Sequence, residues 1–200
     1  MSGKIEIRER LRGFLDPIVA FMSYLGLSPL AVTIIGIVLS IIGATFVARG
    51  SLLAGAVFLV VSGLCDTIDG SLARREGRTT TFGAFIDSTG DRITEMVYFG
   101  ALVFYFINDQ PPNLVVVFFL LAALAGSFLT SYTRARAEGL GLECRVGWVE
   151  RPERIALLVL GLLLGHTVLI AIIVVLAFLT VFTFIQRVLH VRRLTLEKDL

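Results

Sequence analysis

Long apolar runs, interrupted by short clusters of polar residues, dominate this chain of 200 residues. A helix needs about 20 consecutive apolar residues to cross a bilayer, and charged positions are rare inside such segments. The runs predict six membrane-spanning helices, at residues 29–48, 51–70, 83–107, 113–133, 153–165 and 166–187. We therefore expect an all-α integral membrane protein.

The last two predicted spans share a single apolar run. This run, from Ile155 to Phe184, is too long for one span, and Gly165-His166 is the only credible turn within it. The fifth span is then short, and we expect it to begin near Pro152, because proline fits the first turn of a helix. A five-span arrangement is the alternative.

The first 28 residues follow a different pattern. Apolar side chains recur there at helical spacing, with charges on the other side: Ile7, Leu11, Phe14, Leu15, Ile18 and Met22. This is typical of an amphipathic helix lying in the membrane interface. Because the segment has no continuous apolar core, we expect no cleavable signal peptide. The single predicted domain thus comprises a juxtamembrane segment, a transmembrane bundle and a cytoplasmic tail: residues 1–28, 29–187 and 188–200.

Composition agrees with a membrane protein. Hydrophobic residues make up 56% of the chain and charged residues 17%, and the mean hydropathy of +0.87 lies outside the soluble globular range. A net charge of only +2 gives no reason to expect a nucleic-acid partner. The two cysteines, Cys65 and Cys144, lack the spacing of a metal site.

Positive charge gathers on one side of the predicted membrane. All but two of the 18 Lys and Arg residues, the exceptions being Arg49 and Arg92, lie in four segments: the N-terminal segment, the loops at 74–78 and 134–154, and the tail from 187. The opposite loops, 108–112 and 165–166, contain neither Lys nor Arg. The positive-inside rule therefore predicts a multi-pass protein of the cell membrane with both termini in the cytoplasm.

Acidic and small residues form one cluster where two apolar segments meet the solvent on this side. Its spacing is Asp66-x2-Asp69-Gly70-x2-Ala73-Arg74-x8-Gly83-x3-Asp87-x3-Asp91. On helices, the first two aspartates share a face, and the last three specified residues form a stripe with a step of four. Two such helices facing each other would gather four hard oxygen ligands, which suit Mg²⁺ or Mn²⁺. Because glycine and alanine on these faces leave room for a large ligand, the pattern predicts a metal site that receives a phosphorylated substrate.

This motif resembles, with no position missing, the signature of the CDP-alcohol phosphatidyltransferases, integral membrane enzymes of phospholipid synthesis. The resemblance implies that an acceptor alcohol attacks the β-phosphate of a CDP-activated lipid and that CMP leaves. It implies two divalent metal ions bound by Asp66, Asp69, Asp87 and Asp91, with Asp91 also acting as the general base. It further implies nucleotide contacts from Asp66, Asp69, Gly70, Ala73, Arg74 and Gly83, and it favours a homodimer in which each protomer holds its own site.

The acceptor is expected to contact the other cytoplasmic loop. Residues 131–154, with the preceding Ser127, resemble the corresponding part of prokaryotic phosphatidylinositol-phosphate and archaetidylinositol-phosphate synthases, which use inositol phosphate as the acceptor. A phosphorylated acceptor needs cations away from the metals, and arginine binds phosphate with a fork of donors. Four arginines at predicted helix ends are the candidates: Arg134, Arg151, Arg154 and Arg187.

Several alternatives remain open at this point. Leu30 stands where many relatives carry an asparagine, so a polar contact to the nucleotide is absent. Glycerol 3-phosphate is also phosphorylated, which makes a phosphatidylglycerophosphate synthase the alternative function. A cation transporter would use intramembrane aspartates too, although these lie at the membrane edge and no inverted repeat is visible. A CDP-lipid hydrolase would need the same metals and base but no acceptor pocket.

Overall fold

The computed structural model describes residues 16–198, which form helices joined by short loops, without a β-strand in this range. Residues 16–24 are helical, and six further helices follow: α2 (Pro29–Ala48), α3 (Leu52–Arg75), α4 (Thr81–Ile107), α5 (Leu114–Gly139), α6 (Arg151–Leu164) and α7 (His166–Lys198). The expected all-α class is confirmed for the described part of the chain.

Four of the described helices, α2, α3, α5 and α7, are long and apolar enough to cross a membrane. Helix α4 is long enough, with 27 residues, but it carries the charged residues Asp87, Asp91, Arg92 and Glu95. Helix α6 has 14 residues, so it is about 21 Å long, less than the ~30 Å of a bilayer's hydrocarbon core. The structure thus supports a helical membrane protein with four candidate spans, and the count of six stays a prediction.

The predicted break between the last two apolar segments is present. Helix α6 ends at Leu164, and Gly165 follows with a φ of 87°, a backbone conformation that favours glycine. Pro152 lies in the first turn of α6, as expected. Helix α7 continues to Lys198, so most of the segment predicted as a tail is helical.

The predicted interfacial helix is only partly described. Residues 1–15, which include Ile7, Leu11, Phe14 and Leu15 of the amphipathic pattern, lie outside the described residues. In the helical stretch 16–24, Val19 is buried, and the Ser23 hydroxyl donates a 3.0 Å hydrogen bond to Glu76, the residue after α3. This stretch therefore packs on the protein, and its contact with a membrane interface stays a prediction.

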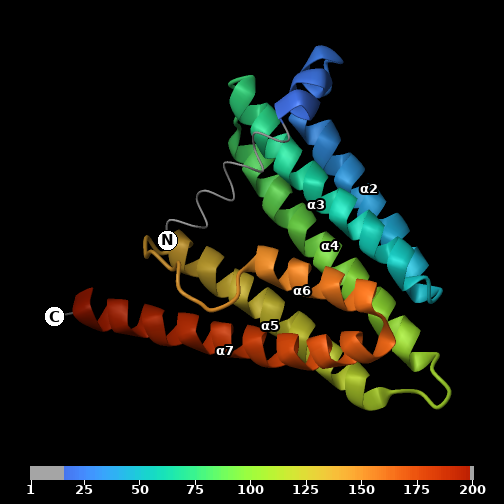
Figure 1. Cartoon of the computed structure of the whole chain (residues 1–200). Helices are drawn as coiled ribbons and strands as arrows, with labels where there is room; N and C mark the ends of the chain where they lie inside the picture. The colour runs from blue at the N-terminus through green and yellow to red at the C-terminus, as the bar shows by residue number, and fades with distance from the viewer. Residues whose placement is uncertain (1–15, 199–200) are drawn as a thin grey trace. The chain divides into compact units, whose positions relative to one another are not determined.

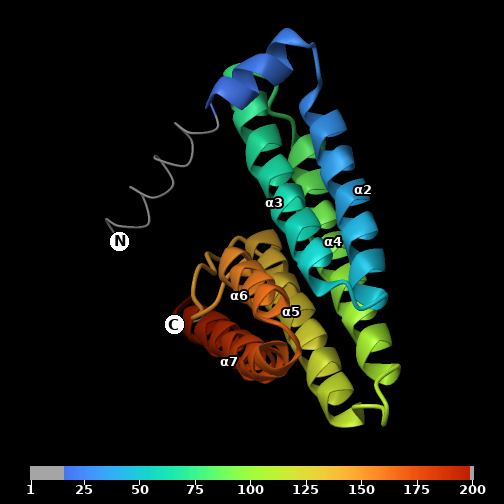
Figure 2. The ribbon, with the colours of Figure 1, turned by 45° about the vertical axis from the view of Figure 1, so that its right-hand side comes forward.

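The chain divides into two compact units. The first comprises Met1–Gly43 and Val57–Thr94, and so contains most of α2 and α3 and the first half of α4. The second comprises Ala44–Ala56 and Glu95–Leu200, and so contains the second half of α4 together with α5, α6 and α7. Within the first unit, α2, α3 and α4 run alongside one another, and within the second α5, α6 and α7 lie together (Figures 1 and 2).

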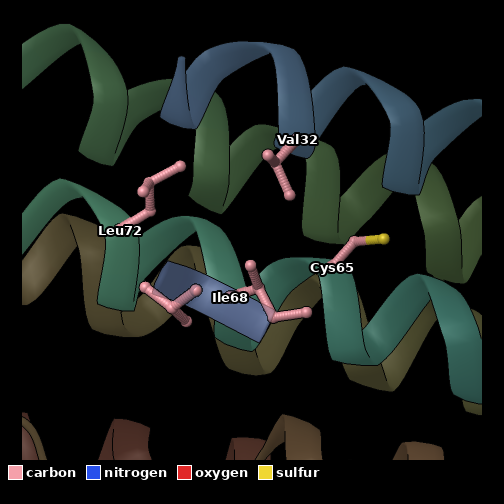
Figure 3. Close-up of a cluster of buried hydrophobic side chains, with 5 residues drawn as sticks. Val32, Cys65, Ile68 and Leu72 are labelled. Carbon is pink, nitrogen blue, oxygen red and sulfur yellow. The ribbon is translucent and has the colours of Figure 1, made fainter. Parts of the chain in front are cut away.

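The first unit is held together by a small apolar core and by close helix contacts. Its core consists of buried side chains from the stretch 16–24, α2 and α3: Val19, Val32, Cys65, Ile68 and Leu72 (Figure 3). A Cβ atom on Gly36 of α2 would lie 3.0 Å from the Cβ of Cys65, and one on Gly90 of α4 would lie 2.9 Å from Ile37. The absence of side chains at these glycines brings α2 close to both α3 and α4, the helices that carry the acidic motif.

In the second unit, α5 and α6 both pack against α7. Gly126 of α5 faces Thr180 of α7 so closely that an added Cβ would overlap the threonine hydroxyl. The loop after α5 is also packed on α7, through an apolar cluster of Ala137, Leu142 and Cys144 with Val146, Val191 and Leu194. This unit therefore fixes the position of the loop after α5, which is expected to contact the acceptor.

Candidate active site

Three of the four predicted metal ligands converge. Asp66 lies on α3, while Asp87 and Asp91 lie one turn apart on α4. One carboxylate oxygen from each of them falls within 4.8 Å of the other two. Hard oxygen donors at this spacing suit a divalent cation such as Mg²⁺ or Mn²⁺. The donor set therefore fits the metal that the motif predicts.

The fourth aspartate, Asp69, contacts α2 as well. Its side chain is buried, and the hydroxyl of Thr33 donates a short hydrogen bond to its Oδ2. Asp69 remains near enough to Asp66 and Asp87 for their negative charges to act on it. Asp69 thus lies beside the group of three, but its oxygens are not among those that lie within 4.8 Å of one another.

Electrostatic repulsion among these carboxylates is the cost of the arrangement. Three of them share a small volume, and Asp69 is close by. Arg92 contributes one positive charge, its Nη1 lying 3.4 Å from Oδ2 of Asp91. Two helices that hold carboxylates this close favour binding of a multivalent cation, which offsets the repulsion.

A pocket of about 280 Å³ adjoins these carboxylates, within the first unit. Its walls come from the start of α2, the end of α3, the loop after it and the start of α4. Every residue predicted to contact the nucleotide, except Asp66, lines it: Asp69, Gly70, Ala73, Arg74 and Gly83. Leu30 lines it too, so its side chain presents an apolar surface there.

Two glycines of the motif shape this pocket in different ways. A Cβ on Gly70 would lie 3.3 Å from Nη1 of Arg74, so glycine leaves room for the arginine side chain to lie over the helix. A Cβ on Gly83 would lie 3.1 Å from the hydroxyl of Thr80, which accepts a 2.9 Å hydrogen bond from the Gly83 N–H. Arg74 thus supplies a positive charge to the pocket. The N-terminal end of α4 adds the partial positive charge of the helix dipole.

The four candidate acceptor arginines all belong to the second unit. Arg134 forms an exposed ion pair with Glu138, with 2.9 Å between Nε and Oε1. Arg154 is buried and pairs with Glu95, its Nε and Nη2 lying 3.0 and 2.9 Å from Oε1. Arg151 is the first residue of α6 and is half-buried.

Arg187 has a different environment from the other three. Its side chain is buried, and it donates hydrogen bonds to two backbone carbonyls, from Nη1 to Thr130 at 2.7 Å and from Nε to Val146 at 2.9 Å. Both acceptors are neutral, and charges of both signs act on the guanidinium, since Arg134 and Arg154 repel it while Glu150 attracts it. Arg134, Arg154 and Arg187 therefore lie near one another, with Arg134 paired to Glu138 and Arg154 paired to Glu95.

Comparison with known proteins identifies the family. The sequence model of one family, CDP-alcohol phosphatidyltransferase, matches residues 27–190. The chain belongs to this family. The archaetidylinositol phosphate synthase of Methanothermobacter thermautotrophicus is 38% identical over 190 residues, covering 93% of this chain and 92% of the relative. The phosphatidylinositol phosphate synthase of Streptomyces avermitilis is 35% identical over 213 residues, covering 98% and 87%.

Solved structures of a CDP-alcohol phosphatidyltransferase share the fold. The crystal structure of Mycobacterium tuberculosis phosphatidylinositol phosphate synthase with CDP-DAG bound superposes with a TM-score of 0.81 at 35% identity, covering 88% of this chain and 92% of that one. The same enzyme in complex with manganese and citrate gives a TM-score of 0.82, covering 88% and 87%. The resemblance read from the motif is therefore confirmed, and the chain is a transferase of this family.

Two residues outside the motif have clear structural roles in this phosphatidyltransferase. Thr33 binds Asp69, and no local sequence pattern marks it, because the contact depends on how α2 packs on α3. Glu95 binds Arg154 and accepts a 2.9 Å hydrogen bond from Ser127. A sequence signal for Glu95 does exist, since it continues the step of four beyond Asp91.

Proposed function

We propose that this protein transfers the phosphatidyl group of a CDP-lipid to inositol phosphate and releases CMP. The observation that carries the proposal is the convergence of Asp66, Asp87 and Asp91 beside a pocket lined by the rest of the motif. Two relatives add the acceptor, because they align over most of the chain and are synthases of archaetidylinositol phosphate and phosphatidylinositol phosphate.

The four motif aspartates are the proposed metal ligands. The group of three with oxygens within 4.8 Å supports this, and Asp69 beside it supplies a fourth carboxylate. We propose two Mg²⁺ or Mn²⁺ ions, because four carboxylates balance two divalent charges. When bound, such ions polarise the phosphoryl oxygens and neutralise the charge that develops on departing CMP.

The nucleotide half of the CDP-lipid is proposed to occupy the pocket of the first unit. Asp69, Gly70, Ala73, Arg74 and Gly83 line this pocket, and Asp66 lies beside it on α3. Arg74 suits a phosphate oxygen because its guanidinium offers several charged donors. The small residues Gly70, Ala73 and Gly83 let the ligand approach the helix backbones closely.

Asp91 is the proposed general base as well as a ligand. In this step a hydroxyl of the acceptor loses its proton to a carboxylate oxygen of Asp91. The hydroxyl oxygen forms the new bond to the β-phosphorus, and the bond from that phosphorus to the oxygen of CMP breaks. A carboxylate is a suitable base here because the proton leaves only as the hydroxyl becomes bonded to phosphorus.

The acceptor's phosphate is proposed to bind Arg134, Arg151, Arg154 and Arg187. Arg187 supports this most directly, since it is a buried cation whose hydrogen bonds go to neutral carbonyls, with Arg134 and Arg154 near it. A phosphate dianion would give the Arg187 guanidinium an anionic partner through charge-assisted hydrogen bonds. Free inositol would not, and we therefore expect it to be a poor acceptor.

Membrane topology and assembly complete the proposal. We infer that α4 and α6 also cross the bilayer, making six spans, and that the segment before α2 lies in the interface. The charge distribution supports cytoplasmic termini and a cytoplasmic active site. The chain is proposed to form one functional domain and to assemble as a homodimer, each protomer with its own site.

The test is acceptor-dependent release of CMP. Purified protein in lipid nanodiscs would receive CDP-lipid and Mg²⁺ with inositol phosphate, free inositol, glycerol 3-phosphate or no acceptor. The proposal expects fast CMP release with inositol phosphate alone. Release without an acceptor would indicate a hydrolase, and faster release with glycerol 3-phosphate would indicate a phosphatidylglycerophosphate synthase.

A further inference from the structure

The orientation of Arg187 depends on a loop. Its guanidinium is held between the carbonyl of Thr130, on α5, and the carbonyl of Val146, in the loop between α5 and α6. The first of these carbonyls belongs to a helix and is fixed by it. The second is in place only if the loop backbone approaches α7 closely.

Gly147, the next residue, makes this approach possible. An ideal Cβ at this position would lie 2.5 Å from Cγ2 of Thr183 and 3.6 Å from Nε of Arg187. Thr183 is fully buried and lies one turn before Arg187 on α7, so its side chain has little room to move aside. Gly147 also has a φ of +136°, a backbone conformation that residues with a side chain rarely adopt.

We propose that Gly147 is a positioning residue for the acceptor site. Because it lacks a side chain, the loop backbone can lie against α7, and the Val146 carbonyl can then hold the Arg187 guanidinium. Any larger residue would move the loop outward and break this hydrogen bond. The inference rests on the proposed function, in which Arg187 binds the acceptor's phosphate.

Two other glycines of the same region provide matched controls. Gly141 has a φ of +72°, but an added Cβ would meet nothing within 4 Å. Gly139 also has open space and no positive φ. Gly139→Ala therefore tests the addition of a methyl group alone, and Gly141→Ala adds backbone strain. Of the three variants, Gly147→Ala alone also creates the contact with α7.

The experiment measures kcat and KM for inositol phosphate and for CDP-lipid in each variant, with thermal stability recorded in parallel. We expect Gly147→Ala to raise the KM for inositol phosphate about 10-fold or more, the effect of losing one hydrogen bond to a charged group. The KM for CDP-lipid should stay within about twofold, as should both KM values in the two control variants.

A second substitution tests the contact itself. Thr183→Ser removes Cγ2, the atom that the new methyl group would meet, and keeps the hydroxyl. In the double variant Gly147→Ala/Thr183→Ser we expect part of the acceptor affinity to return. The recovery should be partial because the backbone strain at residue 147 remains. Thr183→Ser alone should leave both KM values unchanged.

The outcomes separate this inference from the proposed function. If the wild-type protein does not use inositol phosphate, the proposed function fails. If it does, the inference is overturned when Gly147→Ala behaves like Gly141→Ala, or when the double variant recovers nothing. It is also overturned when Gly147→Ala unfolds or loses CDP-lipid affinity as strongly as acceptor affinity, because the glycine would then serve the fold as a whole.

Discussion

Glu95 and Arg154 form a buried ion pair, with Nη2 of the arginine 2.9 Å from Oε1 of the glutamate and side chains that are 4% and 1% exposed for Arg154 and Glu95. Ser127 donates to the other glutamate oxygen at 2.9 Å, so the pair joins α4, α5 and α6. Because both charges are out of water, each depends on the other for compensation. The pair therefore holds Arg154 in place within the cluster of arginines.

Glu95→Gln should destabilise the protein strongly. It leaves the buried Arg154 without a counter-charge, and breaking such a pair costs roughly 3–5 kcal/mol. The matched control is Glu138→Gln, which breaks the exposed pair with Arg134 at a cost of about 0–1 kcal/mol. Thermal unfolding in nanodiscs compares the two, and equal melting temperatures would contradict the structural role of the buried pair.

Asparagine at Asp66, Asp69 or Asp87 should abolish turnover and weaken metal binding. Each substitution removes one negative charge from the proposed ligand set while keeping the side chain's size. Binding of Mn²⁺, followed by electron paramagnetic resonance, gives a readout independent of activity. Asp109→Asn, in the loop between α4 and α5, is the control and should bind Mn²⁺ like the wild type. Unchanged Mn²⁺ affinity in all three variants would exclude this ligand set.

Asp91→Asn should lower kcat by roughly 10²–10⁴-fold or more, the usual contribution of general base catalysis. CDP-lipid binding should fall much less, because three other carboxylates still surround the metals. Single-turnover kinetics and a CDP-lipid binding assay on the same preparation separate the two effects. Parallel losses in binding and in rate would assign Asp91 to metal binding alone.

Arg134→Gln should raise the KM for inositol phosphate by roughly 10- to 100-fold, since a charge-assisted hydrogen bond to phosphate contributes about 1.5–3 kcal/mol. The KM for CDP-lipid should change little. Arg136→Gln provides the control, because Arg136 is exposed in the last turn of the same helix. Equal effects of the two substitutions would show that only bulk surface charge matters.

The sequence predicts the helices and much of the candidate metal site because both depend on local spacing. Apolar runs mark both ends of α2 and the start of α5 almost to the residue, and the proline and glycine signals place both ends of α6. The step of four on α4 correctly puts Asp87 and Asp91 on one face. Their approach to Asp66 follows because α3 and α4 are consecutive and antiparallel.

Contacts between distant segments are what the sequence cannot predict. The hydroxyl of Thr33 reaches Asp69 only because Gly36 brings α2 against α3. The partners of Arg187 are backbone carbonyls, which no side-chain pattern reveals. Arg154 looks in sequence like the other arginines, and its pairing with Glu95 becomes visible only when α4 and α6 are packed together.

The proposed function is tested most sharply by the identity of the lipid product in a competition. Wild-type protein in nanodiscs would receive CDP-lipid, Mg²⁺ and equal concentrations of inositol phosphate and glycerol 3-phosphate, and lipid products would be quantified by mass spectrometry. We expect the inositol phosphate lipid to predominate and chelation of divalent ions to abolish its formation. Predominance of phosphatidylglycerophosphate, or of phosphatidate formed with water, would contradict the proposed function.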